Sequence, residues 1–119
     1  ASGVRLAVVI MTAQEQVYPD FWQGLLQRYP AMQDNDWDME QPNRVLYSIL
    51  DGSNIPYLDL LPIFRQRAAS ARNLLHLRHD GHWTADGERL AGESLYQFLT
   101  QNRLVPVTDA AQTTVTPTP

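Results

Sequence analysis

A nearly unbroken apolar run over residues 4–11, VRLAVVIM, is the feature that most constrains the fold of this chain. The run is rich in β-branched residues and lacks the alternation of a strand that has one face in water. This pattern predicts a central strand buried on both faces, as in a parallel sheet. Helices must then cover both faces of that sheet, which favours an α/β domain.

The rest of the chain alternates between helical and strand patterns. Helices are predicted over 19–29, 42–52, 61–71 and 84–102, and further strands over 55–60 and 74–77. Gly52 is expected to stop the second of these helices, and Thr84 is expected to cap the last one. Residues 33–41 have no apolar period and are expected to form a solvated loop. The order of elements predicts a three-layer α/β fold, with a parallel sheet and helices on both faces.

The predicted boundaries leave one domain and a tail. Residues 1–104 contain all the periodic segments and are expected to form a single domain. Residues 105–119 are rich in Thr and Pro, have no period, and are expected to be a tail or linker.

Composition excludes several classes of function. The chain has 13 acidic and 9 basic residues, a net charge of -4, and no basic cluster, so it lacks the positive surface that nucleic-acid binding requires. With no cysteine, it forms no disulfide, thiolate metal site or cysteine nucleophile. No segment approaches the roughly 20 apolar residues of a membrane span, and no signal-peptide order is visible.

All three histidines of the chain fall within seven residues, His76, His79 and His82, in the string LLHLRHDGHWTADG. The string joins the third predicted strand to the last helix, at the strand end where α/β proteins bind ligands. Imidazole transfers protons near neutral pH, and a nearby carboxylate orients its ring. Asp80 lies two positions before His82 with Gly81 between them, close enough for contact. Such a pair is part of a nucleophile-His-Asp triad.

Other interpretations of these histidines stay open. They can be solvated surface residues, or they can bind Zn or another divalent ion, since His-x-x-His-x-x-His with an Asp offers suitable ligands. The spacing does not make all three converge, because His76 lies in a predicted strand and the others in a loop. For His76 alone, a packed structural role is expected.

Residues 80–84, DGHWT, followed by Gly87, by Leu90 and Ala91 and by an amphipathic helix close to the C-terminus, resemble the last conserved block of the SGNH (GDSL-like) hydrolases. The order of the predicted strands also resembles the second half of that flavodoxin-like α/β fold. The D-x-H-W form is similar to that of SGNH-type O-acetyltransferase-like proteins, including those of alginate acetylation. The resemblance covers about residues 3–102 and implies that this chain is only the C-terminal half of such a domain.

The resemblance implies an ester hydrolase or acyltransferase that uses no cofactor and no metal. His82 would be the catalytic base, Asp80 would orient it, and Trp83 would line the substrate side, although packing is the alternative for Trp83. The substrate would be an ester or carbohydrate-type molecule. Asp59, at the end of the second strand, lies on the same sheet edge, where a helix-capping role is an equal alternative.

The chain departs from the family pattern in two respects. Most of the hydrolases have Asp-x-x-His, whereas Asp80 is two positions before His82. The Gly-Asp-Ser nucleophile block and the oxyanion-hole blocks are also missing, and none of the serines at 2, 48, 53, 70 and 94 lies in such a context. The serine is therefore expected from a missing N-terminal half of the domain or from a second chain, and this chain alone is expected to be inactive.

A different class of function remains as an alternative. The acidic loop 34–40 and the aromatic-rich helix 21–29 are also consistent with a non-enzymatic α/β module that contacts another polypeptide. The compartment is left open, although the Thr/Pro-rich tail and the D-x-H-W form favour an extracytoplasmic bacterial protein, periplasmic or secreted.

Overall fold

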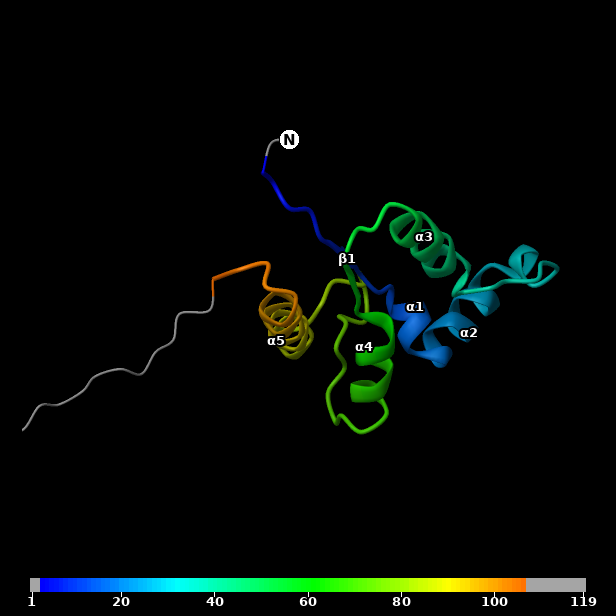
Figure 1. Ribbon diagram of the computed structural model, residues 1–119. Helices are drawn as coiled ribbons and strands as arrows, with labels where there is room; N and C mark the ends of the chain where they lie inside the picture. The colour runs from blue at the N-terminus through cyan, green and yellow to red at the C-terminus, as the bar shows by residue number, and fades with distance from the viewer. Residues whose placement is uncertain (1–2, 107–119) are drawn as a thin grey trace, which may run out of the picture.

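The computed structural model describes residues 3–106, so the greater part of the expected tail, 107–119, lies outside the described residues (Figure 1). Its elements are β1 (Val8–Ile10), α1 (Gln14–Val17), α2 (Pro19–Arg28), the 3-10 turn η1 (Pro30–Met32), α3 (Gln41–Gly52), β2 (Tyr57–Asp59), α4 (Leu61–Ala68) and α5 (Ala85–Gln101). No helix among these residues is long and apolar enough to cross a bilayer.

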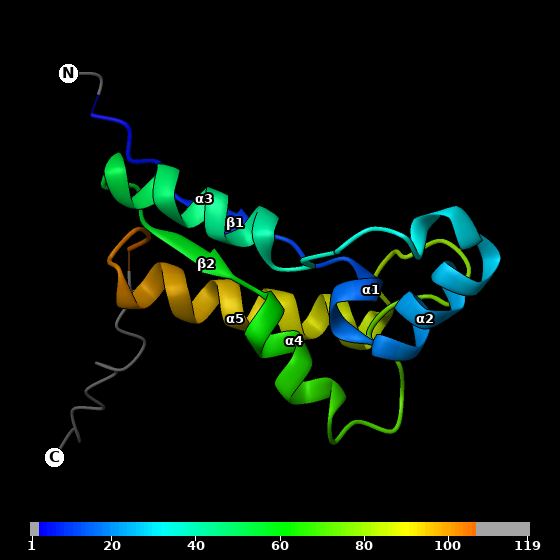
Figure 2. The same ribbon diagram turned by 90° about the vertical axis from the view of Figure 1, so that its right-hand side faces the viewer.

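The two strands form a small parallel sheet. Val8 lies opposite Tyr57 and Ile10 lies opposite Asp59, so both strands end at the same edge. Figures 1 and 2 show α3 and α5 on opposite sides of the strands. The predicted α/β class is therefore confirmed as a mixed α/β structure with a two-stranded parallel sheet.

The prediction of a third strand over 74–77 is wrong. This segment makes one isolated antiparallel bridge, between His76 and Trp83, and pairs with neither β1 nor β2. The Leu77 amide donates a hydrogen bond to the His82 carbonyl at 2.7 Å, so the chain folds back on itself within a few residues. Local pairing therefore replaces the long-range pairing that a sheet strand needs.

The first strand is shorter than predicted. It covers Val8–Ile10 rather than 4–11, and the side chains before it are open to solvent, with Val4 81% and Leu6 60% exposed. Within the described residues β1 pairs only with β2, so Val4 and Leu6 have no neighbouring strand to hold them in a sheet.

The helices agree better with the sequence pattern. Those expected over 19–29 and 42–52 form as α2 and α3, and α5 begins one residue after its predicted cap. The helix expected over 61–71 ends earlier, at Ala68. The single turn α1 was not predicted, because four residues show no helical period.

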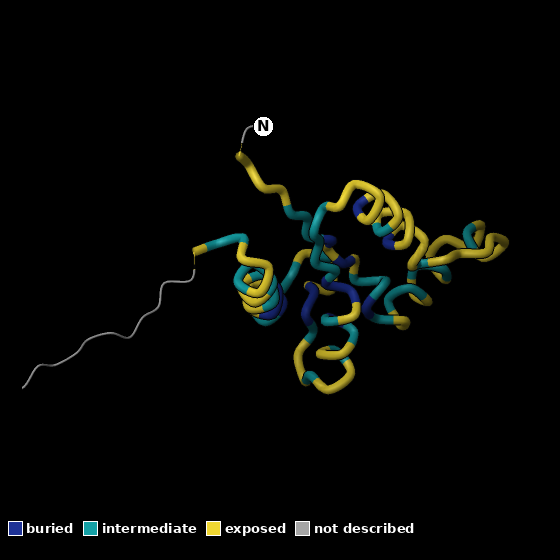
Figure 3. The backbone as a smooth tube through the Cα atoms, in the orientation of Figure 1, coloured by how far each residue is buried: buried dark blue, intermediate teal, exposed yellow. Residues whose placement is uncertain are grey.

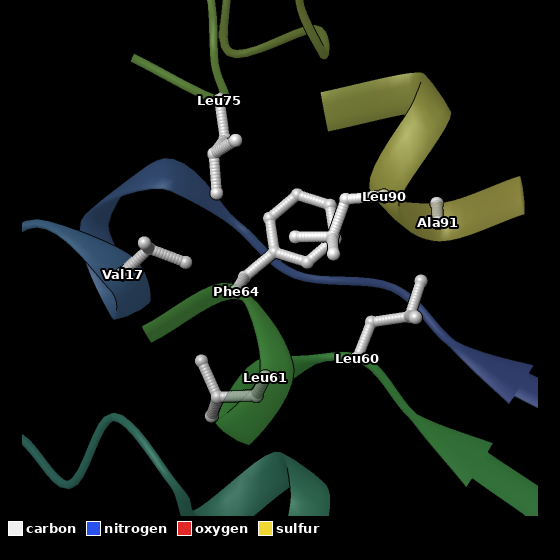
Figure 4. Packing of buried hydrophobic residues seen from close by; sticks show 7 residues of the cluster. All are labelled: Val17, Leu60, Leu61, Phe64, Leu75, Leu90 and Ala91. Carbon is white, nitrogen blue, oxygen red and sulfur yellow. The ribbon is translucent and has the colours of Figure 1, made fainter. Parts of the chain in front are cut away.

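The hydrophobic core lies at the carboxyl ends of the two strands. Seven side chains from α1, the β2–α4 junction, residue 75 and α5 form it: Val17, Leu60, Leu61, Phe64, Leu75, Leu90 and Ala91 (Figure 4). Phe64 at its centre is fully buried. Figure 3 shows the buried stretches gathered where these elements meet, while the outer surfaces of α2, η1 and α3 are mostly exposed.

The apolar face predicted for α3 is mostly not buried. Leu50 is 6% exposed, but Val45 is 53% and Ile49 is 57% exposed. The periodicity correctly located the helix, yet within the described residues little of this face is covered.

We expect Gly87→Ala to destabilise the fold. A β-carbon at Gly87 would lie 2.2 Å from the Leu75 carbonyl oxygen, a backbone atom that cannot rotate away. The free energy of unfolding should fall by about 1–3 kcal/mol, the usual range for overpacking, as measured by urea denaturation followed by circular dichroism.

Gly92→Ala is the matched control on the same helix. Nothing lies within 4 Å of a β-carbon at Gly92, so this change should raise the free energy of unfolding by about 0.5–1 kcal/mol. Equal effects of the two substitutions would contradict the close contact between α5 and Leu75.

Candidate active site

A tight turn over residues 77–82 carries the predicted catalytic pair. The Leu77 amide donates to the His82 carbonyl at 2.7 Å, and the Gly81 amide donates to the Leu77 carbonyl at 3.3 Å. Gly81 has φ of 73°, in the left-handed region that glycine adopts without a steric penalty. The glycine between Asp80 and His82 therefore lets the chain reverse and places both side chains on one turn.

Thr84 fastens this turn to the start of α5. Its amide donates to the Leu75 carbonyl at 2.9 Å, and its hydroxyl donates to the Leu74 carbonyl at 2.8 Å. The same hydroxyl accepts a hydrogen bond from the Gly87 amide at 3.2 Å, which confirms Thr84 as the helix cap. The turn is thus held at its base by backbone and cap hydrogen bonds.

Asp80 and His82 lie in contact. The Asp80 Oδ1 atom is 3.3 Å from the His82 Nδ1 atom, and it also accepts a hydrogen bond from the His82 backbone amide at 3.0 Å. We assign the imidazole proton to Nδ1, because the carboxylate only accepts hydrogen bonds. Nε2 then carries the lone pair, as a general base requires.

The pair is open to solvent. The side chain of His82 is 81% exposed and that of Asp80 is 55% exposed, so water screens their attraction. The hydrogen bond from the His82 amide, together with the imidazole contact and the nearby charge of His79, lowers the pKa of Asp80 below its ordinary value. Asp80 is therefore ionised at neutral pH and able to orient the ring.

His76 does not join the pair. It is fully buried, and its Nε2 atom lies 3.1 Å from the Thr12 hydroxyl, just beyond the end of β1. Burial lowers the pKa of His76, which favours the neutral ring. The packed role expected for this histidine is what the structure shows, and its contact ties the His82 turn to the end of the first strand.

The three histidines do not converge on a metal geometry. His76 is enclosed by the core, whereas His79 and His82 lie in the exposed turn. Among residues 3–106 no group of three or more His, Asp or Glu side chains is arranged to hold a metal ion.

Trp83 is part of the packing beneath the turn. Its ring is partly buried against the core and lies 5.2 Å from the Phe64 ring, centroid to centroid. A contact between Trp83 and substrate stays a prediction.

Asp59 terminates β2 and accepts a hydrogen bond from the amide of Leu61, the first residue of α4, at 2.9 Å. The capping interpretation is thus seen in the structure. The Asp59 carboxylate also accepts hydrogen bonds from the Asn43 amide and the Tyr47 hydroxyl of α3. The bond to Asp59 raises the pKa of Tyr47 to about 12.

The Asp59 network was not predicted from the sequence. Asn43 is buried, and its Oδ1 atom accepts a hydrogen bond from Gln16 of α1 at 3.0 Å. Polar residues on three separate elements carry no motif or period that would join them. Their convergence follows from the packing of α1 and α3 beside the end of β2.

No described serine completes a triad. Ser94 donates to the Leu90 carbonyl within α5, Ser70 donates to the Arg67 carbonyl from the turn after α4, and Ser53 caps the end of α3. Among residues 3–106 no serine hydroxyl is hydrogen-bonded to the His82 ring.

The pKa of Asp80 is expected to lie below 3.8, measured by NMR titration of its carboxyl carbon. The pKa of Asp80 is lower in the folded chain than in the unfolded chain. The carboxylate therefore stabilises the fold at pH values above the unfolded pKa. That contribution is lost as the pH falls through the folded pKa.

His82→Ala is the informative comparison for this titration. The largest cause of the shift is the His82 backbone amide, which alanine retains, so the pKa of Asp80 should stay below 3.8 in the variant. A return of this pKa to 3.8 in the variant would show that the imidazole, rather than the backbone of the turn, lowers the pKa of the Asp80 carboxylate.

Comparison with known protein families gives a match over the whole chain. The family model described as "SGNH hydrolase-like domain, acetyltransferase AlgX" matches residues 1–119. No curated protein and no solved structure matches the chain significantly. The chain therefore belongs to the family of SGNH hydrolase-like domains of the acetyltransferase AlgX type.

Proposed function

We propose that this chain supplies the base and its orienting carboxylate to an SGNH-type acyl transfer reaction at a polysaccharide. The contact of 3.3 Å between Asp80 and the Nδ1 atom of His82 supports this assignment most directly, because it leaves Nε2 available for a hydroxyl proton. Membership of the AlgX acetyltransferase family supports a polysaccharide as the acceptor.

The proposed reaction proceeds in two half-steps. A serine hydroxyl attacks the carbonyl carbon of an acetyl ester, His82 takes the hydroxyl proton, and the proton is returned to the leaving alcohol as the ester bond breaks. A sugar hydroxyl then attacks the acetyl-serine, His82 takes the proton of that hydroxyl, and His82 passes this proton to the serine oxygen as the acyl–serine bond breaks. If water takes the place of the sugar, the same residues catalyse hydrolysis.

Asp80 holds the imidazole in this mechanism. Its carboxylate accepts a hydrogen bond from the His82 amide as well as contacting the ring, so the side chain and the backbone of His82 are positioned together. As the ring gains a proton, the ionised carboxylate stabilises the imidazolium.

We propose that the serine and the oxyanion-hole donors come from another segment of the polypeptide or from a second chain. Apolar side chains near the sheet support this, because Val4, Leu6, Val45 and Ile49 are each more than half exposed. A segment that pairs with β1 and covers α3 would complete a three-layer parallel sheet with helices on both faces.

His82→Ala is expected to lower the acetyl-transfer or esterase rate by at least about 10²–10⁴-fold, the usual contribution of a general base. The measurement uses the protein together with the part that carries the serine, and p-nitrophenyl acetate as the acyl donor. Because the ring of His82 is exposed, the variant should unfold at the same urea concentration as the wild type.

His79→Ala is the control, since it removes a second exposed histidine from the same turn and should leave most of the activity.

Asp80→Asn should lower the rate less than His82→Ala, because the amide retains a contact with the ring. Full activity in His82→Ala would refute the assignment. The chain alone is expected to show no turnover of p-nitrophenyl acetate.

A further inference from the structure

A buried histidine that the proposed mechanism does not use lies at the base of the His82 turn. His76 is fully buried and lies opposite Trp83 in the antiparallel bridge where the turn begins. Its ring packs edge-on against Phe64 of α4 and Tyr18 at the start of α2, with centroid distances of 5.5 and 6.0 Å. An apolar ring would fill this space without the cost of burying polar nitrogen atoms, so packing alone does not account for a histidine here.

The neutral ring of His76 makes one polar contact. Its Nε2 atom lies 3.1 Å from the Thr12 hydroxyl and 3.4 Å from the Thr12 carbonyl oxygen. We assign the imidazole proton to Nε2, because a carbonyl oxygen only accepts hydrogen bonds. Nδ1 then carries the lone pair, and within residues 3–106 it has no hydrogen-bond partner.

A second proton on this ring would bind to Nδ1. It would place a positive charge and an unpaired N–H group inside the core, which costs far more than burying the neutral ring. Burial accordingly lowers the pKa of His76, against smaller opposing effects of the Thr12 hydrogen bond and the Glu15 charge. Because the folded pKa is below the unfolded pKa, the fold loses stability as the pH falls from the unfolded value through the folded one.

The groups around His76 do not offset this charge. The α4 helix contributes the apolar Phe64 and α2 begins beside Tyr18, while Glu15 of α1 acts without a hydrogen bond. The turn and the open surface beside residues 72–78 carry Arg72, Arg78, His79, Asp80, His82 and Asp86. The two arginines repel a second proton on His76, and Asp80 already contacts His82 in water.

The segment at the base of the turn is tied to three parts of the fold. The Thr84 hydroxyl ties it to α5, and the Leu75 amide donates to the Tyr18 hydroxyl at 2.8 Å, which ties it to α2. The third tie runs from His76 to Thr12, just beyond the end of β1. Imidazole is the kind of side chain that ordinarily gains a proton between pH 5 and 8. The tie to β1 is therefore the one that mild acid breaks.

We propose that His76 is a positioning residue, whose neutral ring holds the His82 turn against the end of β1 and whose protonation in mild acid releases that turn. The release is a property of the fold. Its consequence for activity rests on the proposed function, since a released turn no longer holds the His82 base at the serine. Acid then stops the reaction through two protons, one on the base and one on His76.

Hydrogen exchange in the chain tests the release. The Leu77 amide reports the turn, because it donates to the His82 carbonyl at 2.7 Å, and the imidazole NMR signals of His76 report its protonation. The Leu77 protection factor should fall at least about tenfold as His76 gains its proton, with one shared midpoint below 6.5. A constant protection factor across this titration would overturn the proposal, as would a His76 ring that stays neutral until the whole chain unfolds.

Two substitutions separate the proton from the tie. His76→Gln retains an N–H group for Thr12 and cannot gain a proton, whereas His76→Phe retains a ring and loses the tie. The Leu77 protection factor should not depend on pH in either variant, and His76→Gln alone carries this test if His76→Phe does not fold. His79→Ala is the matched control, because it removes an exposed histidine of the same turn and should retain the acid step. An acid step that persists in His76→Gln would overturn the proposal.

The rate of acyl transfer tests the positioning role, with p-nitrophenyl acetate and the protein together with the part that carries the serine. At neutral pH, His76→Phe should lower kcat by about 10-fold to 10²-fold with little change in KM, the cost of a misplaced catalytic group. His76→Gln should recover most of the rate, because it restores the tie to Thr12. Equal losses in the two variants would overturn the positioning role.

The pH profile of kcat/KM links the two tests. Its acid limb should steepen toward a slope of two in the wild type and keep a slope of one in His76→Gln. A slope of one in the wild type would overturn the proposal and leave the assignment of His82 intact. Full activity in His82→Ala would instead refute the proposed function, and the exchange of the Leu77 amide would still decide whether His76 releases the turn.

Discussion

The packing of Phe64 beneath the His82 turn supports the rest of the structure. This fully buried ring lies 5.5 Å from the His76 ring and 5.2 Å from the Trp83 ring, so it contacts both members of the antiparallel bridge at the base of the turn. The Asp80 and His82 side chains above it are largely exposed, and their contact contributes little stability by itself. The geometry of the pair therefore depends on the buried base and on the backbone hydrogen bonds around it.

Buried side chains are unevenly distributed over the structure. Its core gathers at the carboxyl ends of the strands, where α1, α4 and the start of α5 meet, while Val4, Leu6 and much of α3 lie in solvent. Parallel strands are normally covered on both faces and flanked by further strands. The well-packed edge carries the candidate chemistry, and the exposed remainder is the surface that we propose a further segment covers.

The segment after β1 connects the features at this edge. Thr12 contacts the buried His76, Gln14 approaches the His82 turn, and Gln16 bonds to Asn43 in the network around Asp59. A change in this short segment would therefore be felt both at the candidate catalytic pair and at the Asp59 network.

The sequence alone determined the features that depend on neighbours in the chain. Helical periodicity located α2, α3 and α5, Thr84 was predicted as a cap, and Asp80 and His82 were predicted to meet because one glycine separates them. Tertiary structure decided the rest, because those features depend on residues far apart in sequence. It folded 74–77 back onto Trp83 instead of into the sheet, and enclosed His76 against Thr12. No local period or motif encodes these contacts, since each arises only when separate elements compete for the same limited core.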